Sequence, residues 1–225
     1  MLFNTVTYLI FLPVVFACYW SQRGPRGQNW VLLLASMVFY GWWSVPCLGL
    51  MVGTCLLNYC FVQEMQKGGH RKMWLTLSLL LNFGILAVFK YCNFFAGNLA
   101  LMLNTVGLKA DFPTLNIILP VGISFYTFQL SAYVIDCYKG VLQPTRSLLR
   151  FLAFISFFPQ LVAGPIERGR HLMPQLMSRR TFCETEATEG MRLILWGLVK
   201  KMLIADNCAD QVDYIFSNYN TVSMP

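Results

Sequence analysis

Charged side chains are scarce in this sequence. Among its 225 residues, Asp, Glu, Lys and Arg make up 12%, whereas a soluble domain carries about 25%. Hydrophobic residues make up 56%, and the mean hydropathy is +0.54. So few charges cannot cover a water-exposed surface of this size, which excludes an ordinary soluble globular protein, a disordered chain and a nucleic-acid-binding arm. The composition predicts a polytopic membrane protein.

Signatures of soluble enzymes and metal sites are missing as well. The sequence has no G-x-S-x-G, no P-loop, no H-E-x-x-H and no metal-ligand cluster. We therefore expect no metal and no tightly bound cofactor. The only two histidines, His70 and His171, lie in basic loops without the buried setting of a catalytic imidazole. The eight cysteines form no C-x-x-C pair, and most lie in apolar runs, which is typical of small buried hydrophobes.

The charge that is present is basic. The sequence has seventeen Lys and Arg and ten Asp and Glu, which gives a net charge of +7. In a chain this apolar, the excess indicates basic loops at an anionic lipid surface, and we expect no nucleic-acid partner.

Long uncharged runs predict an all-α, polytopic transmembrane bundle of seven to eight membrane-associated helices, forming one domain over residues 1–225. The run 28–63 is nearly twice the ~20 residues needed to cross a bilayer, and the Gly41–Pro46 stretch divides it into two helices. The segment 186–205 has helical periodicity, but its charges leave it too short an apolar stretch to cross alone. The other expected spans are 1–22, bent at Pro13, and then 73–89, 91–108, 112–135 and 151–166.

Loop charges predict the orientation. If seven runs cross and the N-terminus lies outside, the inside loops hold Arg23, Arg26, Lys67, Arg71, Lys72, Lys109, Arg168, Arg170, Arg179 and Arg180. The outside loops then hold Lys90, Lys139, Arg146 and Arg150. This bias favours an outside N-terminus. The assignment depends on the run 91–108, whose asparagines weaken it as a span; if it does not cross, everything after it flips.

The run 112–135 and the residues after it carry a polar stripe. At ~100° per residue, Tyr126, Gln129, Tyr133 and Asp136 lie on the same helix face as Gly122. Lipid would penalise such a face, so it should contact protein or a wet cavity. Two interpretations stay open: the wall of a substrate or acyl-donor passage, or interhelical hydrogen bonds with Asp136 at the water boundary.

Two further segments carry candidate residues. Pro159, Gly164 and Pro165 prevent a regular helix around Gln160, and broken backbone at membrane depth is tolerated only in protein or beside a cavity. A functional loop and a simple helix end both fit. In the segment 186–205, Glu189 and Arg192 are spaced to pair.

Several motifs together resemble the membrane-bound O-acyltransferases, in the branch that O-acetylates bacterial alginate. They are FLP at 11–13, SMVFYGWW at 36–43, KY at 90–91 with NF at 93–94, LPVGISFYTF at 119–128 running to YVID at 133–136, FPQLVAGPI at 158–166, and GLVKK at 197–201 with IAD at 204–206. They extend over nearly the whole chain in the family's order.

The resemblance implies a multi-pass enzyme of the bacterial inner membrane. Such enzymes take an acetyl group from a cytoplasmic donor, expected to be acetyl-CoA, and pass it toward an extracytoplasmic polysaccharide with a periplasmic or surface acetyltransferase partner. The family's histidines lie in Trp-His-Gly and Arg-Trp-His stretches, and neither occurs here. Because family members are much longer, we expect this chain to be the N-terminal half, cut before its catalytic centre beyond Pro225 and inactive alone.

The candidate site residues follow from this interpretation. Tyr126, Gln129, Tyr133 and Asp136 are candidates for the passage wall. The candidates for a donor-side surface are Gln160, Glu167, Arg168, Arg170, Lys200 and Lys201. Contact with lipid headgroups explains the cations equally well. Two alternative functions remain: D-alanyl transfer to teichoic acid within the same superfamily, and a non-enzymatic transporter fragment.

Overall fold

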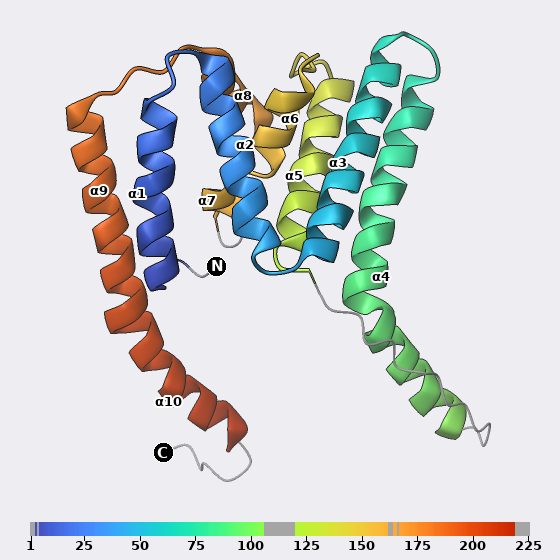
Figure 1. Cartoon of the computed structure of the whole chain (residues 1–225). Helices are drawn as coiled ribbons and strands as arrows, with labels where there is room; N and C mark the ends of the chain where they lie inside the picture. Colours follow the sequence, from blue (N-terminus) through green and yellow to red (C-terminus); the bar gives the residue numbers. More distant parts are fainter. Residues whose placement is uncertain (1–2, 4, 106–119, 162–163, 166, 219–225) are drawn as a thin grey trace. The chain divides into compact units, whose positions relative to one another are not determined.

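The computed structural model describes residues 3, 5–105, 120–161, 164–165 and 167–218. Every regular element within these residues is a helix, as the composition predicts (Figure 1). The chain divides into two compact units. The first unit runs through Val15–Arg180, and the second combines Leu2–Val14 with Thr181–Pro225. Helix α1 (Val6–Trp20) contains Pro13 and contributes residues to both.

The uncharged run 28–63 forms two helices, which confirms the predicted break. Helix α2 (Pro25–Gly41) and helix α3 (Val45–Gln66) each have a proline at one of their first two positions, where its fixed φ suits a helix start. The Ser44 hydroxyl caps α3 by accepting a hydrogen bond from the Cys47 amide at 3.5 Å. Trp42 and Trp43 are exposed in the turn between the helices.

The expected spans 73–89 and 91–108 are not separate elements, so that prediction was wrong. Helix α4 (Arg71–Thr105) continues through both for 35 residues; residues 106–108 lie outside the described part of the chain. A single Lys90 does not end a helix, because lysine is a good helix former. The stretch contains no proline, which would have interrupted it.

The expected span 151–166 was also wrong as one crossing helix. Helix α6 (Leu148–Ile155) ends before the capping residue Ser156, and the one-turn helix α7 (Phe158–Leu161) follows. The segment was expected to break only near Pro159–Pro165, but the first helix ends before it. Helix α8 (Gly169–Met177) was not anticipated, because its basic composition and Pro174 hide the helical pattern. Residues 162, 163 and 166 lie outside the described part.

Helix α5 (Ile123–Tyr138) carries the polar stripe and lies in the core of the first unit, packed against α3 and α4. It begins directly after Gly122 and ends three residues beyond the expected run 112–135, of which 112–119 are not described. Its buried Tyr133 contacts two phenylalanine rings of α6, with centroid distances of 5.1 Å to Phe151 and 5.8 Å to Phe154. By length and composition, Val45–Gln66 and Arg71–Cys92 could each cross a membrane.

The basic loops that the structure describes in the first unit lie at one end, which corrects the predicted division into inside and outside loops (Figure 1). Lys109, predicted in an inside loop, lies outside the described residues. Arg71 donates from Nη2 to the Tyr138 carbonyl at 3.0 Å, and Gln63 donates to the Thr145 carbonyl at 3.0 Å. The loop after α5 therefore lies beside the α3–α4 turn. The reason is the continuous α4: one element replaces two expected crossings, so the segment 139–150 changes sides.

The stretch after α8 returns to the same end. The Asn29 side chain, near the start of α2, donates to the Leu176 carbonyl at 2.8 Å and accepts from Arg180 Nη2 at 2.6 Å. The Arg180 guanidinium also lies over the Tyr19 ring, 5.4 Å from its centroid. Partial burial lowers the pKa of Arg180, and the neighbouring Tyr19 opposes that shift.

In the second unit, helix α9 (Glu184–Val199) continues through a π-helical segment (Lys200–Ala205) into α10 (Asp206–Ser217). The expected pairing of Glu189 with Arg192 is confirmed at 3.6 Å. Large apolar side chains along α9, including Leu193 and Trp196, are exposed.

Candidate functional site

The polar stripe of α5 points into the protein for most of its length. Tyr126 and Tyr133 are at most 1% exposed and Gln129 is 4% exposed, whereas Asp136 is half-buried near the end of the helix. A protein-facing stripe was the expectation, and these burials agree with it.

Two glutamines from different elements meet at one backbone carbonyl. Gln129 of α5 donates from Nε2 to the Phe154 oxygen at 3.1 Å, and Gln160 of α7 donates to the same oxygen at 3.3 Å. Phe154 lies in the last turn of α6, where carbonyls have no partner within the helix. Gln160 is 7% exposed. The structure therefore places it beside the stripe of α5 rather than on a donor-side surface.

The two tyrosines of the stripe differ in their hydrogen bonding. The Tyr133 hydroxyl accepts a bond from the Thr145 amide at 3.1 Å, which ties α5 to the loop before α6. The Tyr126 hydroxyl is buried and has no hydrogen-bond partner among the described residues. An unpartnered buried hydroxyl costs free energy. A polar group retained at that cost is a reason to consider a ligand there.

The broken segment after α6 is held against the start of α5 by a close backbone approach. Gly122 has φ +75°, and a Cβ atom there would lie 2.4 Å from the Leu161 carbonyl oxygen. Only glycine fits both the left-handed backbone and this contact. Gly122, at one end of the stripe, therefore fixes α7 and with it Gln160.

The remaining donor-side candidates come from both units of the chain. Glu167 is half-buried, and Arg168 and Arg170 are exposed at the start of α8. Lys200 and Lys201 belong to the second unit, where both are exposed. Lys200 lies over the Trp196 ring, 5.5 Å from its centroid, and Lys201 pairs with Asp206.

His70 and His171 are both exposed, so neither has the surroundings of a tuned general base. No group of three or more His, Cys, Asp and Glu side chains capable of holding a metal ion occurs in the described part of the chain.

Sequence reasoning missed a buried amide network beside the stripe. Asn58 of α3 donates to Asn82 Oδ1 of α4 at 2.8 Å, and Asn82 donates to the Ser131 hydroxyl of α5 at 3.3 Å. Ser78 donates to Asn58 Oδ1. The signal was available, because Asn58 and Asn82 are amides within apolar stretches of their helices, and polar groups in such stretches pair across helix interfaces. The network joins α5, which carries the stripe, to α3 and α4.

The chain is similar to curated proteins over almost all of its length. It is 37% identical to a probable alginate O-acetylase of Pseudomonas aeruginosa over 98% of the chain and 43% of that protein. It is 35% identical to a peptidoglycan O-acetyltransferase of Helicobacter pylori over 99% of the chain and 48% of that protein. A teichoic acid D-alanyltransferase of Bacillus subtilis is 27% identical over 50% of the chain.

The sequence similarity covers only part of each relative. The chain spans less than half the length of the curated relatives that it matches. No family model matches the chain, and no solved structure matches it. The assignment of this chain to a family therefore rests on the sequence relatives. The all-helical core and its two long apolar helices agree with it.

Proposed function

Because the chain belongs to the membrane-bound O-acyltransferase family, in the branch of the alginate O-acetylases, we propose that it forms part of a multi-pass enzyme that acetylates a polysaccharide. The observation that carries this proposal is the identity to O-acetyltransferases over nearly the entire chain. The apolar helices α3 and α4 support a location in the bacterial inner membrane.

We propose that the basic end of the first unit faces the cytoplasm. The segments 139–150 and 168–180 lie at that end together with Arg23, Arg26 and the α3–α4 turn (Figure 1). This concentration of Lys and Arg is what the positive-inside rule associates with the cytoplasmic face. With α1 crossing once, an outside N-terminus is consistent with this orientation.

In the proposed reaction, the acetyl group leaves the sulfur of a cytoplasmic thioester, with acetyl-CoA as the donor, and ends on a sugar hydroxyl outside the membrane. The acceptor hydroxyl loses its proton to a general base, and the thiolate of the donor takes up a proton. We propose that a family histidine outside these residues acts as a general base or acyl relay within the membrane enzyme. This chain alone would then be inactive.

The chain's own contribution is the passage wall. Gln129 and Gln160 hold the end of α6 beside α5, and the unpartnered Tyr126 hydroxyl offers a hydrogen bond to a passing acyl group. Arg168 and Arg170, exposed at the basic end, are positioned to attract the phosphates of the donor. A periplasmic or surface acetyltransferase would then place the acetyl group on the polymer.

The acceptor has two candidates. Alginate-like exopolysaccharide is favoured by the Pseudomonas relatives, and peptidoglycan by the Helicobacter relative, which matches the chain almost as well. D-alanyl transfer to teichoic acid is less favoured, because the D-alanyltransferases are less similar and match less of the chain.

The experiment expresses the protein that contains this chain in cells lacking their own polysaccharide O-acetyltransferase. Ester-linked acetate is then measured on purified exopolysaccharide, peptidoglycan and teichoic acid. We expect acetate on one polysaccharide and no alanyl ester. Alanyl ester on teichoic acid, or no ester on any polymer despite normal membrane expression, would overturn the proposal.

A further inference from the structure

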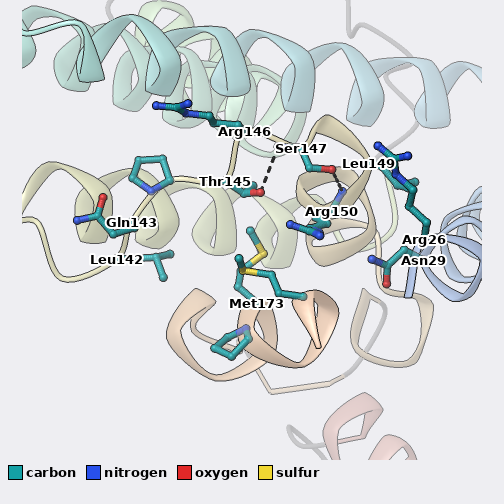
Figure 2. Close-up of a pocket in the computed structure, with 13 residues that line it drawn as sticks. Arg26, Asn29, Leu142, Gln143, Thr145, Arg146, Ser147, Leu149, Arg150 and Met173 are labelled. Atoms are coloured by element: carbon teal, nitrogen blue, oxygen red, sulfur yellow. Dashed lines mark hydrogen bonds between the residues drawn. The ribbon is translucent and has the colours of Figure 1, made fainter. Parts of the chain in front are cut away.

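A cavity opens at the basic end of the first unit, separate from the polar stripe of α5. Its volume is about 700 Å³. Its walls come from the start of α2, the loop after α5, the start of α6 and the second half of α8. Figure 2 shows these side chains, with Arg26 and Asn29 on the opposite side of the view from Gln143.

The lining is strongly basic. Arg26, Arg146 and Arg150 contribute guanidinium groups, and no aspartate or glutamate lines the cavity. Within the part of the chain that the structure describes, no carboxylate forms an ion pair with any of the three. Three unneutralised arginines around one cavity create a positive potential that attracts an anion.

The backbone around the cavity reinforces this potential. Helix α6 begins in the wall: Ser147 caps it by accepting from the Arg150 amide at 3.4 Å, and the Thr145 hydroxyl accepts from the Ser147 amide at 3.2 Å. Arg26 lies in the first turn of α2. Both helix starts add partial positive charge.

The loop that carries Arg146 and leads into the first turn of α6, where Arg150 lies, is held in place by its main chain. The Tyr59 hydroxyl donates to the Arg146 carbonyl at 2.6 Å, and Gln63 and Tyr133 bond to the main chain of Thr145. The Arg146 side chain remains exposed. The cavity is thus a prearranged site whose arginine side chains are not needed to hold the loop.

Part of the remaining lining is apolar, beside the polar side chains of Asn29, Gln143, Thr145 and Ser147. Leu142, Leu149, Met173 and Met177 contribute hydrocarbon or thioether groups. A ligand with a charged end and a hydrocarbon part matches this division of the wall. Arginine guanidinium groups bind phosphate with paired, charge-assisted hydrogen bonds.

We propose that this cavity binds the phosphate group of an anionic ligand, with the phosphodiester of a phospholipid headgroup as the ligand that fits the mixed lining. Basic pockets between membrane helices on the cytoplasmic side bind anionic headgroups. A soluble phosphate compound shares the recognition chemistry and is the other source. The proposal does not depend on acetyl transfer, because the cavity uses none of the wall or donor-side candidates.

The test measures binding to the purified full chain in detergent. Phosphatidylglycerol, phosphatidylcholine and inorganic pyrophosphate are titrated separately, and bound ligand is counted by native mass spectrometry, with the melting temperature as a second readout. We expect phosphatidylglycerol to bind in preference to phosphatidylcholine. Substituting Arg146→Gln together with Arg150→Gln should weaken that binding about tenfold or more, because charge-assisted hydrogen bonds are lost.

Matched variants separate the site from general charge and from folding. Arg23→Gln removes one exposed charge near the same end outside the cavity and should leave binding unchanged. Arg26→Gln, on a different helix from Arg150, should weaken binding while leaving the ligand-free melting temperature unchanged. Arginine-dependent binding of pyrophosphate alone would assign the site to a soluble phosphate. The proposal would be overturned if phosphatidylcholine and phosphatidylglycerol bound equally well and pyrophosphate did not bind. It would also be overturned if substituting the three arginines left binding unchanged.

Discussion

Gln129 and Gln160 donate hydrogen bonds to the same acceptor, the Phe154 carbonyl oxygen, at 3.1 and 3.3 Å. One glutamine lies in the long helix α5 and the other in the one-turn helix α7, 31 positions apart in the sequence. Their convergence joins α5, α6 and α7 at the place where the helical backbone is interrupted. The stability of that junction should therefore depend on the pair rather than on either residue alone.

Removing the two glutamines separately and together tests this dependence. Gln129→Leu or Gln160→Leu should each cost about 1 kcal/mol, because the other amide still satisfies the carbonyl. The double variant should cost more than the sum, by about 1 kcal/mol or more, because a buried carbonyl then has no partner. Thermal unfolding in detergent measures the three values. Gln175→Leu on α8, which is exposed and bonds only to its own helix, is the control. Strict additivity would contradict the shared-acceptor interpretation.

Two glycines with the same backbone conformation separate strain from contact. Gly122 and Gly140 have φ of +75° and +74°, but only Gly122 faces the Leu161 carbonyl; nothing lies within 4 Å of a Cβ at Gly140. Gly140→Ala should cost about 1 kcal/mol from the left-handed backbone alone. Gly122→Ala should cost clearly more, because α7 must move away. Equal melting temperatures for the two variants would show that the α5–α7 contact does not contribute to stability.

The amide network should stabilise the packing of α3, α4 and α5. Asn82→Leu leaves Asn58 and Ser131 without their shared partner, so we expect a loss of about 1–3 kcal/mol. Asn98→Leu on the same helix removes only a bond to the Phe94 carbonyl one turn earlier, at an exposed site. It should change the free energy of unfolding little. Unfolding followed by circular dichroism compares the two. A similar small effect for both would mean that the buried network contributes little.

The single basic end makes a topological prediction. Reporter fusions in the 64–72 loop and the 139–147 loop should read the same compartment, because Arg71 and Gln63 bond to the main chain of that later loop. A fusion in the 167–183 segment should agree with both. Opposite compartments for the first two loops would contradict the single basic end and support the arrangement expected from seven separate crossings.

The sequence predicted those features that depend on local chemistry. The Gly41–Pro46 stretch separates α2 from α3 because its residues suit a turn and a helix start, and the Glu189–Arg192 spacing alone predicts their pairing. The 3.6-residue period was also enough to place Tyr126, Gln129 and Tyr133 on one protected face. Each of these inferences needed only neighbouring residues.

The features that were missed depend on tertiary packing. The residues next to Gln160 in the sequence do not indicate whether its side chain is exposed or buried, because the carbonyl to which it bonds belongs to another helix. Arg26, Arg146 and Arg150 line one cavity only because the loop after α5 lies at the same end as the start of α2. That arrangement in turn depends on α4 being continuous, and the single Lys90 suggested an interruption where none occurs.

Tyr126→Phe gives the most direct test of the claim that the α5 stripe forms part of an acyl passage. The substitution removes only a buried hydroxyl without a partner among the described residues. It should therefore leave the melting temperature unchanged or raise it slightly.

In the protein that contains this chain, ester-linked acetate on the polysaccharide should nevertheless fall severalfold, at equal membrane expression, if that hydroxyl contacts the acyl group. Tyr8→Phe, outside the stripe, is the control with the same chemical change. Unchanged acetate with Tyr126→Phe, and likewise with Gln129→Ala at normal expression, would contradict the account and leave the stripe as structural hydrogen bonding alone.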